Sequence, residues 1–128
     1  MSIRNEIKAA LRTALGASFY FEESPEQAAY PYRVGSFGSS FDDEVAEVAY
    51  LELDYWGQGK STAALDDLIE ADAGDGDRLQ PTGLNKRRIA LPSGYVALAM
   101  DGCVPVEDPD RTIRHRRVTY SMRIYREG

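Results

Sequence analysis

The sequence is poor in the residues that cross-link small proteins or ligate metals. It contains one cysteine, Cys103, and one histidine, His115. A single cysteine excludes an internal disulfide, and one cysteine with one histidine cannot supply the four nitrogen or sulfur ligands of a structural zinc site. We therefore expect no cofactor and no metal, and we expect Cys103 to be a reduced, half-buried apolar residue.

Long apolar runs are also missing. No segment approaches the ~20 apolar residues that cross a bilayer, and residues 1–6 lack the apolar stretch of a secretory signal. We therefore expect no membrane partner. With 128 residues, of which 43% are hydrophobic and 28% charged, the chain has the size and apolar content of one folded domain, which we expect to span residues 1–128.

The chain lacks the basic surplus of a dedicated nucleic-acid binder, since its net charge is −6. The charge is unevenly distributed along the sequence. Residues 1–77 hold 5 basic and 16 acidic side chains, whereas residues 78–128 hold 10 basic and 5 acidic ones. This split suits head-to-tail self-association or docking onto a charged neighbour. Alternatively, the two portions neutralise each other within one fold.

Two segments show the 3.6-residue period of amphipathic helices. The first helix is expected over residues 2–15, capped by Ser2 and ended by Gly16. The second is expected to start with Ser61 or Thr62 as its cap and to end at Gly74. Its expected inward residues are Ala64, Leu65, Leu68 and Ile69, and its expected outward residues are Asp66, Asp67, Glu70 and Asp72.

Alternation of polar and apolar residues and β-branched or aromatic content predict the strands. They are expected over residues 17–22, 30–36, 45–56, 88–91, 95–100 and 114–126. In the long strand at 45–56, Tyr50, Glu52 and Trp56 should share the polar face. Runs of strands with only two helices predict an α+β domain, a single mostly antiparallel sheet with two helices packed on one face.

Two connections between the strands contain turn-forming residues. Residues 35–43 are rich in glycine and serine and should form a flexible loop that carries Phe37 and Phe41. These two aromatics either present a partner-binding tip or fold back onto the core. Asp101-Gly102 predicts a second turn, followed by an irregular segment.

A phosphate-binding loop is suggested by Gly57-Gln58-Gly59-Lys60-Ser61-Thr62, which lies between an expected strand and an expected helix. Two observations argue against it. The position five residues before the Gly-Lys pair is Asp54 instead of glycine, and the strands come in consecutive runs where a nucleotide-binding fold would alternate strands and helices. We therefore expect a turn here and keep nucleotide binding through Lys60 and Ser61 as a minor alternative.

No other catalytic pattern is visible. His115 has no cysteine, serine or carboxylate partner at a recognisable spacing, and acidic groups such as Asp42-Asp43 and Asp66-Asp67 do not match a calcium-binding loop. We expect a protein that is not an enzyme. An adaptor that binds a basic partner through Asp66, Asp67 and Glu70 remains another hypothesis.

The order of the elements resembles the tail completion or tail terminator proteins of long-tailed bacteriophages. The resemblance lies in the N-terminal amphipathic helix, the strand start Tyr30-Pro31-Tyr32-Arg33-Val34, and the long strand that ends Leu51-Glu52-Leu53-Asp54-Tyr55-Trp56-Gly57. A Gly- and Ser-bearing turn, the helix over 63–73 and a basic C-terminal strand over 115–125 complete it. The resemblance covers most of the chain.

The resemblance implies a non-enzymatic structural subunit of the virion, assembled in the host cytoplasm. Such subunits form a homo-oligomeric ring, commonly a hexamer, at the head–tail junction. The ring ends growth of the tail tube, contacts the tail tube protein and the head connector, and lets DNA pass without specific binding. A neck connector or minor capsid subunit is the alternative in the same class. The expected interface residues are Phe37, Phe41, Tyr50, Glu52, Trp56, Asp66, Asp67, Arg114, Arg116, Arg117 and Arg123.

Overall fold

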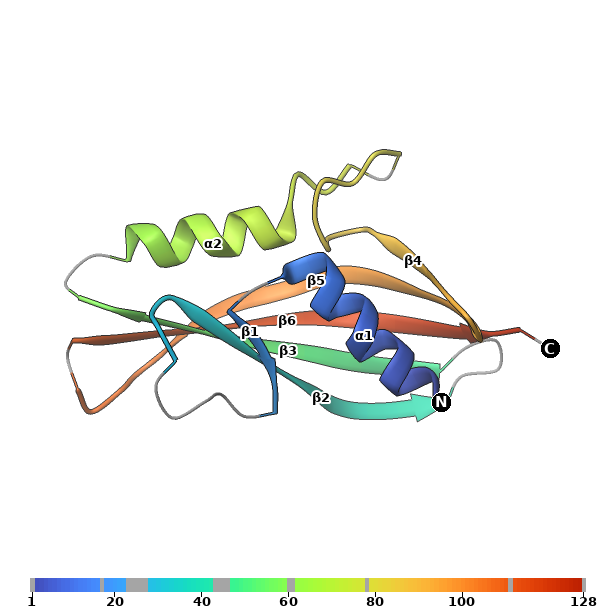
Figure 1. The fold of residues 1–128 in the computed structure, drawn as a ribbon, viewed down its shortest axis with the longest axis horizontal. Coiled ribbons are helices and arrows are strands. Elements are labelled where there is room, and N and C mark those ends of the chain that lie inside the picture. Colours follow the sequence, from blue (N-terminus) through green and yellow to red (C-terminus); the bar gives the residue numbers. More distant parts are fainter. Residues whose placement is uncertain are drawn as a thin grey trace.

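The computed structural model describes residues 2–16, 18–22, 28–42, 47–59, 62–77, 79–110 and 112–127, with backbone alone for 39–42. Within these ranges the chain forms two helices and six strands. They are α1 (Ile3–Leu15), β1 (Phe19–Phe21), β2 (Tyr32–Asp42), β3 (Glu47–Gln58), α2 (Ala63–Ala73), β4 (Arg88–Leu91), β5 (Gly94–Val106) and β6 (Ile113–Arg126). The strands make one sheet in the order β1-β2-β3-β6-β5-β4, and α1 and α2 pack on it (Figure 1). The predicted α+β class is confirmed.

All neighbouring strands in the sheet are antiparallel except β1 and β2, which are parallel. The last strand, β6, lies in the middle of the sheet between β3 and β5. It pairs with the whole of β3, from Glu47 opposite Ile124 to Gln58 opposite Ile113. Because this pairing has no register shift, the apolar residues of β3 and β6 lie on one face of the sheet and the polar residues on the other.

The hydrophobic core lies between the two helices and one face of the sheet. Ile7 and Leu11 from α1 and Leu65 and Ile69 from α2 belong to a single buried cluster with the inward residues of the strands. The strand residues in the cluster are Phe19, Ala49, Leu51, Leu53, Tyr55, Val96, Leu98, Val118, Tyr120, Met122 and Ile124. In β6 the buried residues Val118, Tyr120, Met122 and Ile124 alternate with less buried ones, as the polar-apolar alternation of this strand predicts.

The ends of α1 form as its sequence predicts. The Ser2 hydroxyl accepts a hydrogen bond from the Asn5 N–H at 3.2 Å, and Gly16, with φ of 75°, donates its N–H to the Arg12 carbonyl at 2.9 Å. Glycine is favoured at this end because it adopts positive φ without strain. The helix contacts β1 and β4, the two outermost strands of the sheet.

Glu6 of α1 is buried, although charged residues of an amphipathic helix usually face solvent. Its side chain is 6% exposed, and its carboxylate accepts hydrogen bonds from the Ser93 N–H at 2.8 Å and the Ser93 hydroxyl at 2.6 Å. Ser93 lies in the turn between β4 and β5. A buried carboxylate requires such donors, and the sequence alone does not reveal a donor 87 residues away.

The second helix, α2, begins after Thr62 and ends before Gly74, as predicted, but Thr62 makes no capping hydrogen bond with its side chain. Thr62 precedes it and donates its hydroxyl to the Asp66 carboxylate at 3.0 Å instead of accepting from a backbone N–H, and Ser61 lies outside the described residues. Leu65 is buried as expected, whereas Ala64 is exposed. In the part of the chain that the structure covers, no helix is long and apolar enough to span a membrane.

Both predicted turns are strand in the structure. β2 continues through the Gly- and Ser-rich segment to Asp42, with a shift in register between Phe37 and Ser40. β5 runs through Asp101-Gly102 to Val106, again with a register shift. In each case the antiparallel partner strand supplies the hydrogen bonds that local composition does not reveal, and the register shift accommodates the irregular residues. Cys103 on this part of β5 is exposed, which corrects the expected half-buried position.

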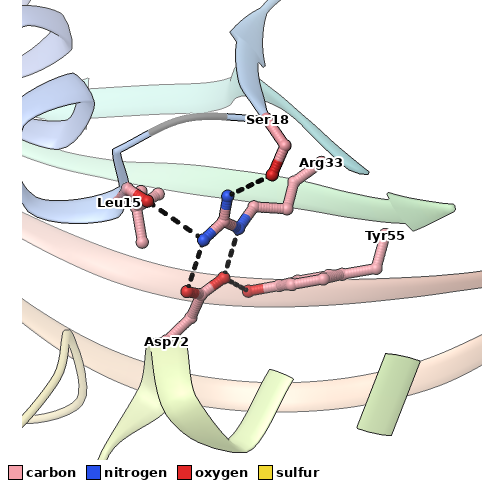
Figure 2. Close-up of polar contacts among 5 residues, drawn as sticks. All are labelled: Leu15, Ser18, Arg33, Tyr55 and Asp72. Atoms are coloured by element: carbon pink, nitrogen blue, oxygen red, sulfur yellow. Dashed lines mark hydrogen bonds and ion pairs between the residues drawn. The ribbon is translucent and has the colours of Figure 1, made fainter. Parts of the chain in front are cut away.

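A buried polar cluster ties α2 to the sheet and to the end of α1 (Figure 2). Arg33 of β2 donates through Nε and Nη2 to the two carboxylate oxygens of Asp72, at 2.6 and 2.8 Å. The Tyr55 hydroxyl donates to the same carboxylate at 2.7 Å, and Arg33 also donates to the Leu15 carbonyl at 3.1 Å and the Ser18 hydroxyl at 3.3 Å. Asp72 was expected to point outward, so this position was predicted wrongly.

Candidate functional site

The face of the sheet opposite the helices is the open face of the molecule. On β3, Tyr50, Glu52 and Trp56 are half-buried and alternate with fully buried core residues. Pairing with β6 places Ser121 opposite Tyr50 and Thr119 opposite Glu52 on the same face. The predicted polar face of the long strand is thus confirmed, and no described helix covers it.

A compact charged cluster lies on this open face. Asp54 Oδ1 accepts a hydrogen bond from Arg117 Nε at 2.9 Å and lies 2.8 Å from His115 Nε2. The Trp56 ring stacks on the imidazole of His115, with ring centroids 3.8 Å apart. The hydrogen bond and negative charge of Asp54 raise the pKa of Arg117. The expectation that His115 has no carboxylate partner is wrong, because the antiparallel register sets Trp56 opposite His115 and Asp54 opposite Arg117.

The cluster does not have the arrangement of a hydrolytic site. A nucleophile activated by histidine must lie within hydrogen-bonding reach of the imidazole. Among the described residues, His115 forms its hydrogen bond with Asp54, and none joins it to a hydroxyl or a thiol. The described part of the chain also contains no group of three or more histidine, cysteine, aspartate or glutamate residues arranged to hold a metal ion.

Aromatic side chains extend the cluster toward one edge of the sheet. Tyr32 stacks on Trp56 at 6.4 Å, and Tyr20 and Tyr30 approach Tyr32 at 6.2 and 5.4 Å. Tyr30 is 40% exposed, so the row ends at solvent. Large rings that are partly exposed and held by their neighbours are typical of surfaces that bind other proteins, because they bury much area at little entropic cost.

The structure brings together five of the eleven predicted interface residues. Tyr50, Glu52, Trp56, Arg117 and Arg123 share the open face. The described side chains place three others near α2. Arg114 donates to the Gly59 carbonyl at 3.2 Å and Arg116 lies 3.7 Å from Asp66, so these two arginines point toward the helix side.

The remaining predicted interface residues lie apart from the open face. Asp67 is exposed on α2. Phe37 packs against the core beside Phe21, with Arg4 and Lys8 over its ring, which is the folded-back arrangement. The side chain of Phe41 lies outside the described residues.

The charge split of the sequence is partly neutralised within the fold. Arg117 pairs with Asp54, Arg116 with Asp66, and Arg126 with Glu47 at 3.1 Å. Each of these pairs joins the basic portion of the chain to the acidic portion. Asp54 and Glu47 lie on β3, directly beside β6, and Asp66 lies on α2. The neutralising alternative therefore accounts for part of the asymmetry, and surfaces that keep one sign of charge lie elsewhere on the molecule.

The suggested phosphate-binding loop does not have the expected setting. Gly57 and Gln58 belong to β3, and Lys60 and Ser61 lie outside the described residues. Both neighbours of β3 are antiparallel to it. A phosphate-binding loop belongs to a parallel sheet of alternating strands and helices, and the observed topology differs from this.

The fold and this surface define a two-layer α+β domain with an open sheet face rich in polar and aromatic side chains. The same fold occurs in a protein chain from the virion of a native gene transfer agent particle. That structure matches with a TM-score of 0.62 and 14% sequence identity, over 97% of this chain and 92% of the other. No family model and no curated protein sequence matches this chain. At this level of identity, the likeness shows a shared fold.

Proposed function

We propose that this protein is a non-enzymatic structural subunit of a phage or phage-like virion. The observation that carries the proposal is the fold shared with a chain of a gene transfer agent virion, because the match spans nearly the whole length of both chains.

Within that class, we propose the role of a tail terminator or tail completion subunit at the head–tail junction. The order of helices and strands that resembles this family is the order seen in the fold. In this role, copies of the chain form a ring, of six subunits in the family, that ends the tail tube and joins it to the head connector. A neck connector or minor capsid subunit is the alternative role.

The open face supplies a surface for contacts between subunits in this proposal. Tyr50 and Glu52 are half-buried there, and Arg123 is exposed. A surface with aromatic rings flanked by charged and hydroxyl side chains can pack against a neighbour and still be stable in water before assembly. Acidic and basic groups on the same face also favour pairing with a complementary face.

The proposal is tested by assembly of the purified protein. Light scattering after size exclusion is expected to give the mass of a ring, and electron microscopy with purified tail tubes is expected to show the protein at one end of each tube. Tyr50→Ala with Glu52→Arg should weaken the ring, whereas Arg12→Ala on the exposed side of α1 should not. A protein that stays monomeric, ignores tube ends and is absent from particles contradicts the proposal. Binding to head connectors alone, without tubes, would support the neck role.

A further inference from the structure

A basic pocket of about 600 Å³ lies at the start of β4, away from the open-face cluster. Its wall combines three consecutive cations, Lys86, Arg87 and Arg88, with the apolar side chains of Leu79, Pro81 and Leu98. Leu79 is 91% exposed at the rim, which makes it the most exposed large apolar side chain among the described residues. Exposed apolar groups beside unneutralised charge mark surfaces that bind a partner.

The cations of this basic pocket are not neutralised by the rest of the described chain. No ion pair within the described ranges involves Lys86, Arg87 or Arg88, although the Arg88 guanidinium lies over the Tyr95 ring. The carboxylates of the acidic loop at residues 75–77 form hydrogen bonds with backbone N–H groups and no ion pair with these cations. The Asp75 carboxylate accepts the N–H groups of Asp77 and Thr82, and the Asp77 carboxylate accepts the N–H of Leu79.

The opposite charge is presented by an acidic tip, residues 104–110, where β5 turns into β6. This segment contains Glu107, Asp108 and Asp110 and no basic residue. Glu107 is exposed and forms no ion pair with the described residues, and Val104 is 54% exposed. Glu107 and Asp108 line a hollow that Arg114 and Arg116 of their own chain also line. Asp108 accepts a hydrogen bond from the Asp110 N–H, and Asp110 accepts two from Thr112, which follows the tip, so the turn holds these two acidic groups in place.

The acidic tip and the basic pocket lie at opposite ends of α2. Thr62, at the start of the helix, lines a hollow together with Pro105 and Val106 of the tip. The helix ends at Gly74, and a loop connects it to β4 (Figure 1). Leu79 and Pro81 of this connection line the pocket. An 11-residue helix is about 16 Å long, so the tip cannot reach the pocket of its own chain.

We propose that the acidic tip of one copy docks in the basic pocket of a neighbouring copy. Glu107 and Asp108 pair with Lys86 and Arg87, while Val104 and Pro105 pack on Leu79. The inference deepens the proposed function, on which it rests, because it adds a second contact between adjacent subunits to the one proposed for the open face. The contact uses two different patches, so it is head-to-tail, and its repetition closes a ring when the rotation between subunits closes.

Charge reversal at the two ends tests this contact. Glu107→Lys, in the tip, and Arg87→Glu, in the pocket, should each raise the protein concentration needed for half-assembly by roughly tenfold or more, because like charges then face each other. Matched controls carry the same charge changes elsewhere. Glu127→Lys and Arg12→Glu alter exposed residues away from both surfaces and should assemble as the wild type does. Circular dichroism and thermal unfolding establish that each variant is folded.

The decisive experiment mixes the Glu107→Lys and Arg87→Glu variants. In an equimolar mixture, the lysine tip of one variant meets the glutamate pocket of the other, and the remaining contacts are wild type, so assembly should return. A wild-type ring that neither reversal weakens, or that the mixture fails to restore, overturns the docking contact and leaves the ring in place. A wild-type chain that is monomeric at every concentration overturns the ring itself and this contact with it.

Discussion

Arg33 of β2 and Asp72 of α2 form a two-point ion pair in the interior of the protein. The pair joins residues 39 positions apart, and the two side chains are only 5% and 6% exposed. Removing two charges from water is costly, and the cost is offset only when geometry is good and the remaining polar atoms are satisfied. Tyr55, Ser18 and Leu15 supply those additional hydrogen bonds. The cluster therefore fixes how α2 and the end of α1 sit on the sheet.

Removing one partner of this pair should destabilise the fold strongly. Asp72→Ala leaves the Arg33 guanidinium buried without its counter-charge, and we expect a loss of about 3–5 kcal/mol in the free energy of unfolding. Urea unfolding followed by circular dichroism measures it. Asp67→Ala, on the exposed side of the same helix, should change the free energy by less than about 0.5 kcal/mol. Equal effects of the two substitutions would contradict this account.

The two buried tyrosines of the sheet should respond in opposite ways to loss of their hydroxyls. Tyr55 donates to Asp72, whereas the Tyr120 hydroxyl is buried and has no hydrogen-bond partner among the residues that the structure describes. We expect Tyr55→Phe to lower the free energy of unfolding by about 1–3 kcal/mol, and Tyr120→Phe to leave it unchanged or raise it. Thermal and urea unfolding of the two variants measure these changes in the free energy of unfolding. A larger loss for Tyr120→Phe would show that its hydroxyl is satisfied after all.

Tyr55 and Tyr120 should ionise at a higher pH than the other tyrosines. Burial, together with the negative charge of Asp72, raises the pKa of Tyr55 and of Tyr120 well above the usual value. The unfolded chain ionises both near pH ~10, while the folded chain keeps both protons. The resulting stability is therefore complete below pH ~10 and is lost as the pH rises further. Tyrosinate absorbance should show these two of the eight tyrosines ionising only when the protein unfolds. Ionisation of all eight tyrosines in the folded protein would contradict this prediction.

A glycine at the start of β5 should be irreplaceable. Gly94 has φ of 154°, and a Cβ there would lie 1.8 Å from the Tyr125 carbonyl oxygen on β6. We expect Gly94→Ala to cost at least about 2–3 kcal/mol, because backbone on β6 must move. Gly102 on the same strand has nothing within 4 Å of an added Cβ, so Gly102→Ala is the control and should change stability by less than about 1 kcal/mol. Comparable melting temperatures for both variants would refute the steric argument.

The sequence predicted those features that depend on neighbouring residues. Both helices and the alternation of β3 and β6 follow from local periodicity, and the caps at Ser2 and Gly16 follow from local chemistry. The class of the fold followed from the order of these elements.

The features that could not be predicted from the sequence depend on contacts between residues that lie far apart in the sequence. Asp72 lies seven residues after Leu65, on the buried stripe of α2, but its acidity suggested solvent because Arg33 could not be placed beside it. The contact between His115 and Asp54 can be predicted only when the register of β6 on β3 is known. Strand pairing also extended β2 and β5 through segments whose composition favours turns. The basic pocket combines residues that are scattered along the sequence from Leu79 to Leu98.

The central position of β6 has a consequence for synthesis of the protein. Without it, the described strands fall into two separate groups, β1-β2-β3 and β5-β4, neither of which has a partner for its inner edge. Because β6 leaves the ribosome after the other seven elements, the sheet cannot be completed until translation has passed Arg126. A chain cut short before this strand would expose the long ladders of β3 and β5 and should be removed by proteolysis. Only a chain that includes β6 can therefore complete the sheet.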